Sequence, residues 1–260
     1  MKIATWNVNS IKARLPTVIK VLQEIDCDVV CLQEIKCETD AFPYLEIEEL
    51  GYSCAVHGQK SYNGVALLSK HPIEDVVTGL PGFEEDDQAR YVEALILGDQ
   101  PVRVAGIYLP NGNPAPGPKY DYKLDWMDRL HAHAMSQLAL EEPFVICGDY
   151  NTIPREEDCW DATVWADDAL ARLPTRKAYR RLVNAGFVDA FDMLDRRAHQ
   201  YTFWDYQGGA WQKDHGIRID HHLVTPQAAD RMEGIEIFRK ARGFEKPSDH
   251  VPVVLTLSDA

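Results

Sequence analysis

The feature of this sequence that most constrains its fold is a long series of short strand-like runs. These runs are rich in apolar and β-branched residues and lie at 2–6, 28–33, 64–69, 91–97, 102–109, 144–147, 216–224 and 251–257. Helical patterns are fewer: an apolar stripe follows Pro16 over residues 18–25, and a second helix is expected at about 120–140. Because strands outnumber helices and do not alternate strictly with them, the sequence argues against a doubly wound nucleotide-binding sheet. It favours two β-sheets packed together with helices outside.

The composition is that of an ordinary soluble protein, and nothing in it divides the chain. Of the 260 residues, 45% are hydrophobic and 26% are charged, which is enough apolar material for a sizeable core. No Gly/Ser linker or low-complexity tract interrupts the sequence, so we expect a single domain over residues 1–260. No run approaches the roughly 18 apolar residues of a membrane span, and Met1 leads into a strand-like run without a signal-peptide pattern. A cytoplasmic protein without membrane contact is expected.

Polar residues gather where the strand-like runs end. The apolar run 143–147 stops at Gly148-Asp149-Tyr150-Asn151, and since positions i and i+2 of a strand point the same way, Asp149 and Asn151 could face one substrate. A surface turn is the alternative, because Gly, Asp and Asn are common turn residues. The functional interpretation is favoured by further polar clusters at 6–9, 32–36, 108–112, 218–221 and 247–250.

The residue types in these clusters point to one chemistry. Glu34, Asp249, Asn7 and Asn151 carry the oxygen atoms that hard cations such as Mg²⁺ take as ligands. His250, with a carboxylate nearby, could donate a proton or a hydrogen bond to a phosphate oxygen. No plausible serine or cysteine nucleophile sits beside a base in these clusters. Metal-assisted attack of water on a phosphodiester is therefore the leading hypothesis, with acyl transfer a distant second.

The clusters, in this order, resemble the exonuclease III family of apurinic/apyrimidinic endonucleases, within the wider endonuclease/exonuclease/phosphatase superfamily. The wider superfamily shares four of these features: Asn7, the Gln33-Glu34 pair, Gly148-Asp149-x-Asn151 and Ser248-Asp249-His250. The match is narrowed from the superfamily to the exonuclease III family by segments 6–14, 32–36, 216–220 and 246–253. The resemblance covers nearly the whole chain. It implies an α/β fold (α+β in some schemes), a DNase I-like four-layer αββα sandwich of two packed mixed β-sheets flanked by helices, with the site at one rim.

For the metal, the resemblance implies that Glu34 is the main ligand. Asn7 lies beside it, and Asp249 corresponds to a second metal position. Mg²⁺ is the expected cofactor, and Mn²⁺ is a possible substitute. Asp149 corresponds to the residue that activates the attacking water or serves the leaving group, and both roles stay open.

The resemblance also implies a set of residues that bind the phosphate. Tyr108 and Asn151 would hold the phosphate and stabilise its developing charge, and His250 would polarise it while Asp220 orients the imidazole. A carboxylate bonded to one imidazole nitrogen fixes the tautomer and raises the histidine pKa, so physical chemistry favours the same pairing. A protonated His250 would then stabilise the charge that builds on the phosphate. The alternative is that Asp220 only satisfies backbone groups in an irregular strand.

The resemblance finally implies which residues would contact DNA. The residues matched to DNA contacts, any of which could instead be an ordinary surface residue, are Lys12, Arg14, Tyr62, Arg90 and Asn111. The segment 201–204 matches the wall of a pocket for an extruded abasic sugar, in which Phe203 would face Ile217 and Ile219. Some family members carry Trp where this chain has Phe203 or Ile217. Core packing is the alternative for this segment, since aromatic pairs are common in protein cores.

The resemblance implies a Mg²⁺-dependent DNA repair nuclease. Its expected reaction is hydrolysis of the phosphodiester 5′ to an abasic site, with 3′→5′ exonuclease activity and removal of 3′-blocking groups as companions. The expected partners are DNA duplexes with abasic sites or 3′ ends, bound by a monomer. One rival is a superfamily phosphodiesterase or phosphatase acting on RNA or on inositol or lipid phosphates, which the net charge of −14 favours. The other, a binding module without chemistry, is disfavoured because every catalytic position holds a matching residue type.

Overall fold

The apolar runs form two six-stranded β-sheets in the computed structural model, which describes residues 1–258. The first sheet consists of β1 (Lys2–Asn7), β2 (Val29–Gln33), β3 (Ser53–His57), β4 (Val65–Ser69), β11 (Met232–Ile237) and β12 (Val253–Leu257). The second sheet consists of β5 (Ile73–Thr78), β6 (Tyr91–Ile96), β7 (Val102–Tyr108), β8 (Phe144–Asp149), β9 (Val188–Asp189) and β10 (Asp220–Val224). The strand orders are β11-β12-β1-β2-β4-β3 and β5-β6-β7-β8-β10-β9.

The two sheets pack against each other through their inner faces. Ile3, Cys31 and Leu255 of the first sheet belong to the same buried cluster as Val104 and Cys147 of the second. Every residue of β2, β4 and β8 is buried. Because these strands are covered on both faces, they appear in the sequence as continuous apolar runs rather than as an apolar–polar alternation.

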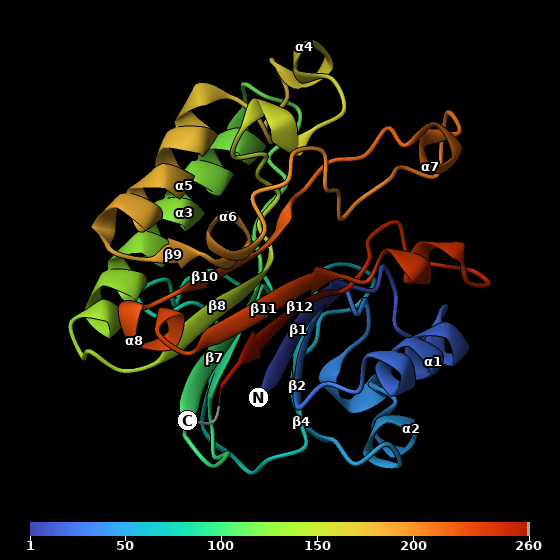
Figure 1. Cartoon of the computed structure of the whole chain (residues 1–260), viewed down its shortest axis with the longest axis vertical. Helices are drawn as coiled ribbons and strands as arrows, with labels where there is room; N and C mark the ends of the chain where they lie inside the picture. The colour runs from blue at the N-terminus through green and yellow to red at the C-terminus, as the bar shows by residue number, and fades with distance from the viewer. Residues whose placement is uncertain (259–260) are drawn as a thin grey trace.

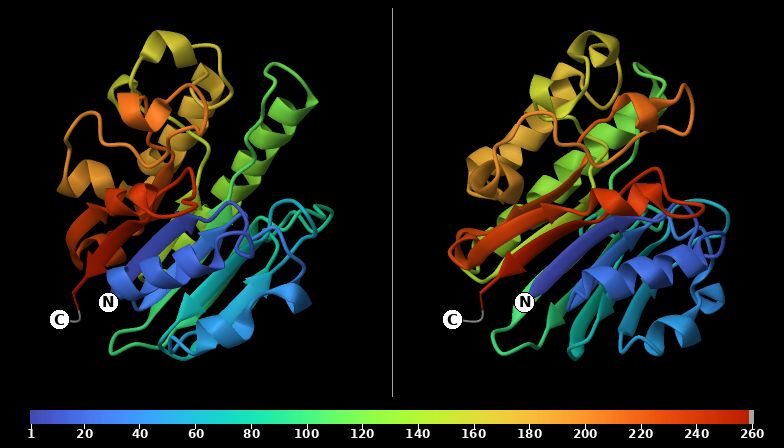
Figure 2. Two further views of the ribbon diagram at one scale, coloured as in Figure 1. Left: turned by 90° about the vertical axis from the view of Figure 1, so that its right-hand side faces the viewer. Right: turned by 45° about the vertical axis from the view of Figure 1, so that its right-hand side comes forward.

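Helices cover the outer faces of both sheets. Figures 1 and 2 show α1 (Leu15–Ile25) and α2 (Tyr44–Glu48) on one side, with α3 (Pro118–Leu138) and α5 (Leu173–Ala185) on the other. The order of layers is therefore helix, sheet, sheet, helix, and the expected αββα sandwich is confirmed. Shorter helical segments are α4 (Ala162–Trp165), α6 (Ala190–Leu194), α7 (Ala210–Lys213), α8 (Pro226–Ala229), η1 (Thr39–Ala41), η2 (Glu156–Asp158) and η3 (Arg239–Gly243). No helix within residues 1–258 is both long and apolar enough to cross a membrane.

Each sheet has a parallel pair of strands at its centre. β1 and β2 run parallel with α1 between them in the chain, and β7 and β8 run parallel with α3 between them. The remaining pairs within residues 1–258 are antiparallel. The carboxyl ends of parallel strands meet at one edge of a sheet, where ligands of α/β proteins commonly bind. The polar clusters that follow β1, β2, β7 and β8 therefore converge at one rim of the sandwich.

The strands that the sequence analysis did not identify are β3, β5, β9 and β11. All of them are edge strands of the two sheets. Edge strands bury fewer side chains, and in β5 every residue is at least partly exposed, so the apolar signal in the sequence is weak. The helix expected at about 120–140 runs from Pro118 to Leu138, and its earlier start fits the preference of proline for the first helical turn.

The strand expected at 216–224 is regular only from Asp220 onward, so its first part was wrongly predicted. Residues 216–219 lie outside β10, and Ile217 forms isolated bridges with Cys159 and Phe203. Other partners satisfy the backbone here: the N–H of Arg218 donates to the carbonyl of Asp158 at 2.8 Å. An apolar sequence pattern alone does not distinguish such a buried irregular segment from a strand.

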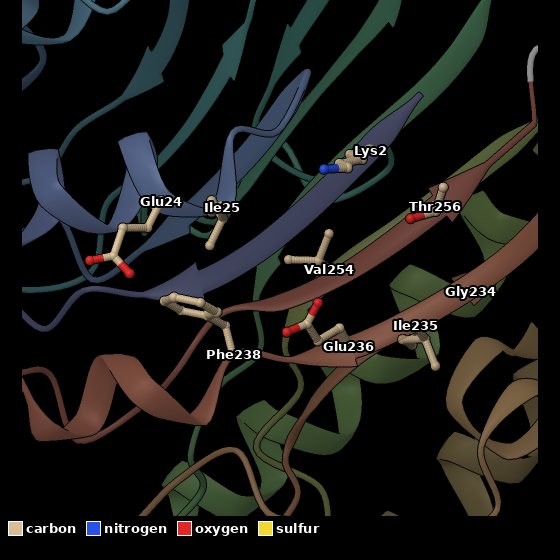
Figure 3. Close-up of a pocket in the computed structure, with 9 residues that line it drawn as sticks. All are labelled: Lys2, Glu24, Ile25, Gly234, Ile235, Glu236, Phe238, Val254 and Thr256. Carbon is tan, nitrogen blue, oxygen red and sulfur yellow. The ribbon is translucent and has the colours of Figure 1, made fainter.

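An open trough of about 400 Å³ lies on the outer face of the first sheet, between α1 and β11 (Figure 3). It is lined by Lys2, Glu24, Ile25, Gly234, Ile235, Glu236, Phe238, Val254 and Thr256. The trough borders Lys2 at the start of β1, whereas the polar clusters lie beyond the end of that strand. It is therefore separate from the rim described above.

Candidate active site

The centre of the site is an amide that links two carboxylates from different sheets. Asn7 ends β1, Glu34 follows β2, and Asp149 ends β8. Asn7 Nδ2 donates to Glu34 Oε1 at 2.8 Å and to Asp149 Oδ2 at 3.0 Å, while Asn7 Oδ1 accepts from the Asn9 backbone at 2.9 Å. Asn7 thus offers its nitrogen, not its oxygen, to the centre. It holds the carboxylates in place, and its expected role as a metal ligand stays a prediction.

The ends of the central strands of the second sheet place three polar side chains in one row. Asp149 on β8 pairs in register with Tyr108 on β7 and with Asp220 on β10. Gly148 permits this close pairing, because a Cβ atom there would lie 2.0 Å from the carbonyl oxygen of Ile107. The glycine before Asp149 is therefore required by backbone contact rather than by a turn.

Glu34 is held as an anion in an unusual backbone conformation. Its φ of +50° lies in the left-handed region, which non-glycine residues seldom adopt and which is often found at functional sites. Glu34 Oε2 lies 2.8 Å from Nζ of Lys36. Burial alone would raise the pKa of Glu34, but hydrogen bonds from Asn7 and Lys36 and the charge of Lys36 bring it below its usual value. The carboxylate is therefore ionised, with Asn7 on one oxygen and Lys36 on the other.

A buried histidine stands between two aspartates. His250 Nδ1 lies 2.9 Å from Oδ2 of Asp220, and His250 Nε2 lies 3.7 Å from Oδ2 of Asp149. Burial alone would lower the pKa of His250, but the charges of Asp220 and Asp149 outweigh it and raise the pKa to about 10. Burial raises the pKa of Asp149 to about 7, with His250 acting in the opposite direction. At neutral pH the imidazole is therefore charged and Asp149 can exchange a proton.

Two amide side chains meet beside Asp149. Asn111 Nδ2 donates to Oδ1 of Asn151 at 3.1 Å, and Asn151 Nδ2 donates to the carbonyl of Leu109 at 2.8 Å. The backbone N–H of Asn151 donates to Oδ1 of Asp149 at 2.9 Å, which requires a left-handed φ of +44°. Burial, with the charges of Glu34 and Asp149, raises the pKa of the neighbouring Tyr108, so its hydroxyl stays a hydrogen-bond donor.

These side chains surround a cavity of about 290 Å³. The residues that line it are Glu34, Tyr108, Asn111, Asn113, Asp149, Asn151, Trp165, Asp168, Leu170, Phe203, Asp205, Ile217, Ile219, Asp249 and His250. One wall carries carboxylates, amides and a charged imidazole, and the other carries aromatic and aliphatic side chains. This combination suits a ligand with a charged group and an apolar body.

The comparison with known proteins agrees with this geometry. The sequence model of the endonuclease/exonuclease/phosphatase family matches residues 4–250. The chain belongs to this family. Exodeoxyribonuclease III of Haemophilus influenzae is 32% identical over 97% of this chain and 98% of its own length, and it confirms the expected resemblance to the exonuclease III group.

Solved structures of the endonuclease/exonuclease/phosphatase family have the same fold. A 3′ phosphatase from Neisseria, bound to a product DNA hairpin, is 35% identical and has a TM-score of 0.95 over 99% of each chain. An AP endonuclease from Archaeoglobus fulgidus is 36% identical, with a TM-score of 0.94 over 99% of each chain. The likeness extends over 99% of this chain.

The family site in this chain offers oxygen ligands to a divalent cation. Glu34 and Asp249 both line the cavity, and Asp249 Oδ1 accepts from Asn9 Nδ2 at 3.2 Å. Carboxylate oxygens are the ligands that hard cations prefer, so the donor chemistry of these two residues suits such an ion. Asp149, Asp220 and His250 also have potential ligand atoms within 4.8 Å of one another. Within this second group, Asp220 and His250 already bond to each other.

The expected sugar-binding residues lie together on the apolar wall. Phe203 and Ile217 face each other through an isolated antiparallel bridge, and Ile219 lines the same cavity. The Phe203 ring meets the His250 ring edge-on, with 4.9 Å between centroids. Ile217 and Ile219 are buried while Phe203 is half-buried, so the aromatic ring borders both the core and the cavity.

The residues expected to contact DNA divide into free and occupied side chains. Lys12 is exposed and Tyr62 is 72% exposed, so both can meet a ligand. Arg14 is used within the protein: its guanidinium donates to the carbonyl of Pro247 at 3.0 Å and to the Tyr206 hydroxyl at 2.8 Å. Arg90 lies over the Tyr108 ring and donates to the Tyr108 carbonyl. The two arginines therefore hold parts of the rim together. Because some of their N–H groups already donate to protein acceptors, fewer remain for the DNA contacts expected of them.

Several cavity residues were not identified from the sequence. Trp165 and Leu170 extend the apolar wall, while Asn113, Asp168 and Asp205 add polar groups to the rim. All of them come from α4 or from irregular loops, where periodicity gives no signal. An aromatic residue in a polar loop, such as Trp165, is the one clue the sequence offers. In Figure 1, α4 and α7 extend past the sheets on the side where β1 ends.

Proposed function

We propose that this chain is a metal-dependent DNA repair nuclease that hydrolyses the phosphodiester 5′ to an abasic site and also shortens or cleans 3′ ends. The observation that carries the proposal is the His250–Asp220 pair facing Asp149 beside an apolar wall, within one cavity of about 290 Å³. Relatives named as an exodeoxyribonuclease III, a 3′ phosphatase and an AP endonuclease support the same reaction class.

In this reaction the protein side chains position the phosphate and move a proton. A divalent cation held by Glu34 and Asp249, which we propose to be Mg²⁺ with Mn²⁺ as a substitute, would neutralise charge on the phosphate. His250, kept as an imidazolium by Asp220, stabilises the negative charge that develops on a phosphate oxygen. Asp149, with a pKa of about 7, exchanges a proton with the attacking water or the leaving oxygen.

The phosphate also needs neutral hydrogen-bond donors, which the second sheet supplies. Each primary amide has two N–H donors, and Asn111 and Asn151 each use one of them on a protein partner. The remaining N–H groups and the Tyr108 hydroxyl stand at the cavity and donate to phosphate oxygens. Such preorganised donors stabilise a transition state more than a ground state, because the charge they meet develops during the reaction.

The apolar wall gives the proposed preference for an abasic nucleotide. Phe203, Ile217 and Ile219 enclose a space that accepts a deoxyribose without its base. Moving an abasic sugar out of the duplex costs less than moving a nucleotide, since no base has to be unstacked or unpaired. We further propose that the protein acts as a monomer, which light scattering with and without DNA would check.

The decisive experiment is incision of a duplex that carries one tetrahydrofuran abasic analogue, beside an intact duplex, with Mg²⁺ or with EDTA. We expect cutting 5′ to the analogue that EDTA abolishes and that the Asp149→Asn variant does not show. Digestion of both duplexes from their 3′ ends would make exonuclease the main activity. Failure to cut either duplex, with release of phosphate from an inositol phosphate, would overturn the proposal in favour of the rival substrate class.

A further inference from the structure

A lysine side chain is completely buried behind the amides of the site. Lys123, on α3, is 0% exposed, and its Nζ donates to the carbonyl oxygen of Asn111 at 3.1 Å and to the carbonyl oxygen of Asn151. These residues lie on different loops, one after β7 and one after β8. The ammonium therefore joins the backbones of the two loops directly under their amide side chains.

The surroundings of Lys123 leave little freedom to this contact. A Cβ atom on Gly112, which follows Asn111 with a φ of +88°, would lie 2.7 Å from Cδ of Lys123. The loop backbone thus packs directly on the lysine stem. Asn113 reinforces the same junction, since its Nδ2 donates to both carboxylate oxygens of Asp168 at 3.1 and 3.2 Å. The loop after β7 is therefore tied at two points to the segment between β8 and α5.

Burial of the Lys123 ammonium between two carbonyl groups destabilises the fold. Burial lowers the pKa of Lys123 to about 7, against the opposing charges of Asp149 and Asp168. No carboxylate in the described part of the chain forms an ion pair with Lys123 within 4.0 Å. An ammonium removed from water without a paired anion destabilises a fold. The contacts of Lys123 are therefore better explained by a role in the site than by a contribution to stability.

We propose that Lys123 is a positioning residue of the nuclease: it ties the Asn111 carbonyl to the Asn151 carbonyl and so fixes the spacing of the two amides that bind the phosphate. The Asn111 Nδ2 to Asn151 Oδ1 hydrogen bond of 3.1 Å is the direct product of this spacing. Lys123 acts through the amides and lines no part of the cavity. The proposal rests on the function proposed above, in which these amides bind the phosphate.

The experiment compares Lys123→Met with Lys119→Met, a matched change at an exposed lysine on the same helix. We expect Lys123→Met to lower kcat on the abasic duplex by about 10- to 100-fold, the range for residues that orient a catalytic group. The dissociation constant for DNA in EDTA should stay nearly constant, because the amides are misplaced and not removed. Lys119→Met should match the parent protein. Full activity of Lys123→Met would overturn the proposal.

A double-mutant cycle separates positioning from a general structural effect. If Lys123 acts through Asn151, the Lys123→Met change should add nothing to Asn151→Ala, and the double variant should be as slow as Asn151→Ala alone. Losses that multiply would overturn the proposal. If the methionine variant is insoluble, Lys123→Gln keeps two N–H donors without the charge and replaces it in the cycle.

Nuclear magnetic resonance gives a readout that does not depend on cleavage. The side-chain amide signals of Asn111 and Asn151, assigned from their alanine variants, should both shift in Lys123→Met and stay in place in Lys119→Met. Unshifted signals would overturn the positioning role even if the rate falls. If the parent protein cuts no DNA, the proposed function fails while the amide signals still decide whether Lys123 sets their spacing.

Discussion

His250 Nδ1 and Asp220 Oδ2 are 2.9 Å apart, and both side chains are almost completely removed from solvent. The pair comes from the segment before β12 and from the first residue of β10, so it joins the two sheets. A buried carboxylate on one imidazole nitrogen leaves the other nitrogen 3.7 Å from Asp149, and both residues line the cavity.

The first prediction concerns this pair. Asp220→Asn removes the charge that raises the pKa of His250, so the imidazole should lose its proton at lower pH. We expect the rate on an abasic duplex to fall by about 10²- to 10⁴-fold, the usual contribution of a positioned acid or base, and the alkaline limb of the pH–rate profile to move to lower pH. A profile with the parent's alkaline limb would contradict the assigned role.

The second prediction concerns the metal. Glu34→Gln keeps the side-chain shape but removes the anionic oxygen that faces the cavity, and we expect at least about a 100-fold loss of activity because the carboxylate supplies most of the attraction to a hard cation. Calorimetric titration with Mn²⁺ should show weaker binding than in the parent protein. Glu38→Gln, an exposed acidic position four residues along the chain, is the control and should bind Mn²⁺ normally.

The third prediction separates the two interpretations of Phe203. If the ring mainly forms the sugar pocket, Phe203→Ala should lower abasic incision more than digestion of an intact 3′ end, with little change in unfolding temperature. If the ring mainly fills the core, the same change should cost about 3–5 kcal/mol of stability. Its half-buried position and its contact with His250 favour the first outcome, and equal loss of both activities would argue against it.

The fourth prediction uses salt to count phosphate contacts. Binding to an uncleavable duplex should weaken as salt rises, and Lys12→Ala should reduce the slope of log K against log salt by about 0.9, the value for one phosphate contact. Arg14→Ala should behave differently. Its guanidinium holds Pro247 and Tyr206, so we expect a lower unfolding temperature with a nearly unchanged slope. A salt slope that Lys12→Ala leaves unchanged would remove that residue from the interface.

The fifth prediction is a loss of stability in mild acid. Burial and the charge of Arg218 lower the pKa of His221 to about 4, and the neutral ring accepts from Arg218 while its Nε2 faces the Thr152 carbonyl. The unfolded chain binds this proton at higher pH than the folded one does. His221 should therefore cost roughly 1.4 kcal/mol per pH unit as pH falls from about 6.5 to 4.

Urea unfolding at several pH values would measure this effect. In the parent protein, Asp149 also contributes to the slope of unfolding free energy against pH, and its raised pKa acts in the opposite direction. The contribution of His221 must therefore be measured by comparison with a variant. The asparagine of a His221→Asn variant cannot take up the proton. The slope of its unfolding free energy against pH should therefore be smaller by the contribution of about one proton, roughly 1.4 kcal/mol per pH unit. Equal slopes in the two proteins would show that His221 titrates alike in the folded and unfolded chains.

The sequence located the site because of how the strands are connected. Asn7, Glu34, Tyr108 and Asp149 each end or follow a strand of a parallel pair, and parallel strands bring such positions to one edge. The order of clusters then fixed the family. The edge strands were missed because partly exposed strands such as β5 carry few apolar residues. Each of them also pairs with only one neighbouring strand, and such pairing leaves no pattern in the sequence.

Lys123 shows what periodicity could have revealed. It lies on the buried face of α3 with Tyr120, Met127 and Leu130, at helical spacing. A charged residue within an apolar stripe indicates a buried ion, but the partner carbonyls belong to loops whose course no local pattern predicts. The contacts of Arg14 with Pro247 and Tyr206 were hidden in the same way, because these two acceptors are more than 190 residues distant in sequence.

The order in which the chain is made also matters for the site. Asn7 lies in the first strand, whereas His250 precedes the last, and Trp6 Nε1 donates to the His250 carbonyl at 3.1 Å across the full length of the chain. A ribosome-bound or truncated chain that stops before residue 250 lacks both His250 and β12, which is one of the two strands that pair with β1. Asn7 and His250 therefore come together beside Asp149 only when both ends of the chain are present.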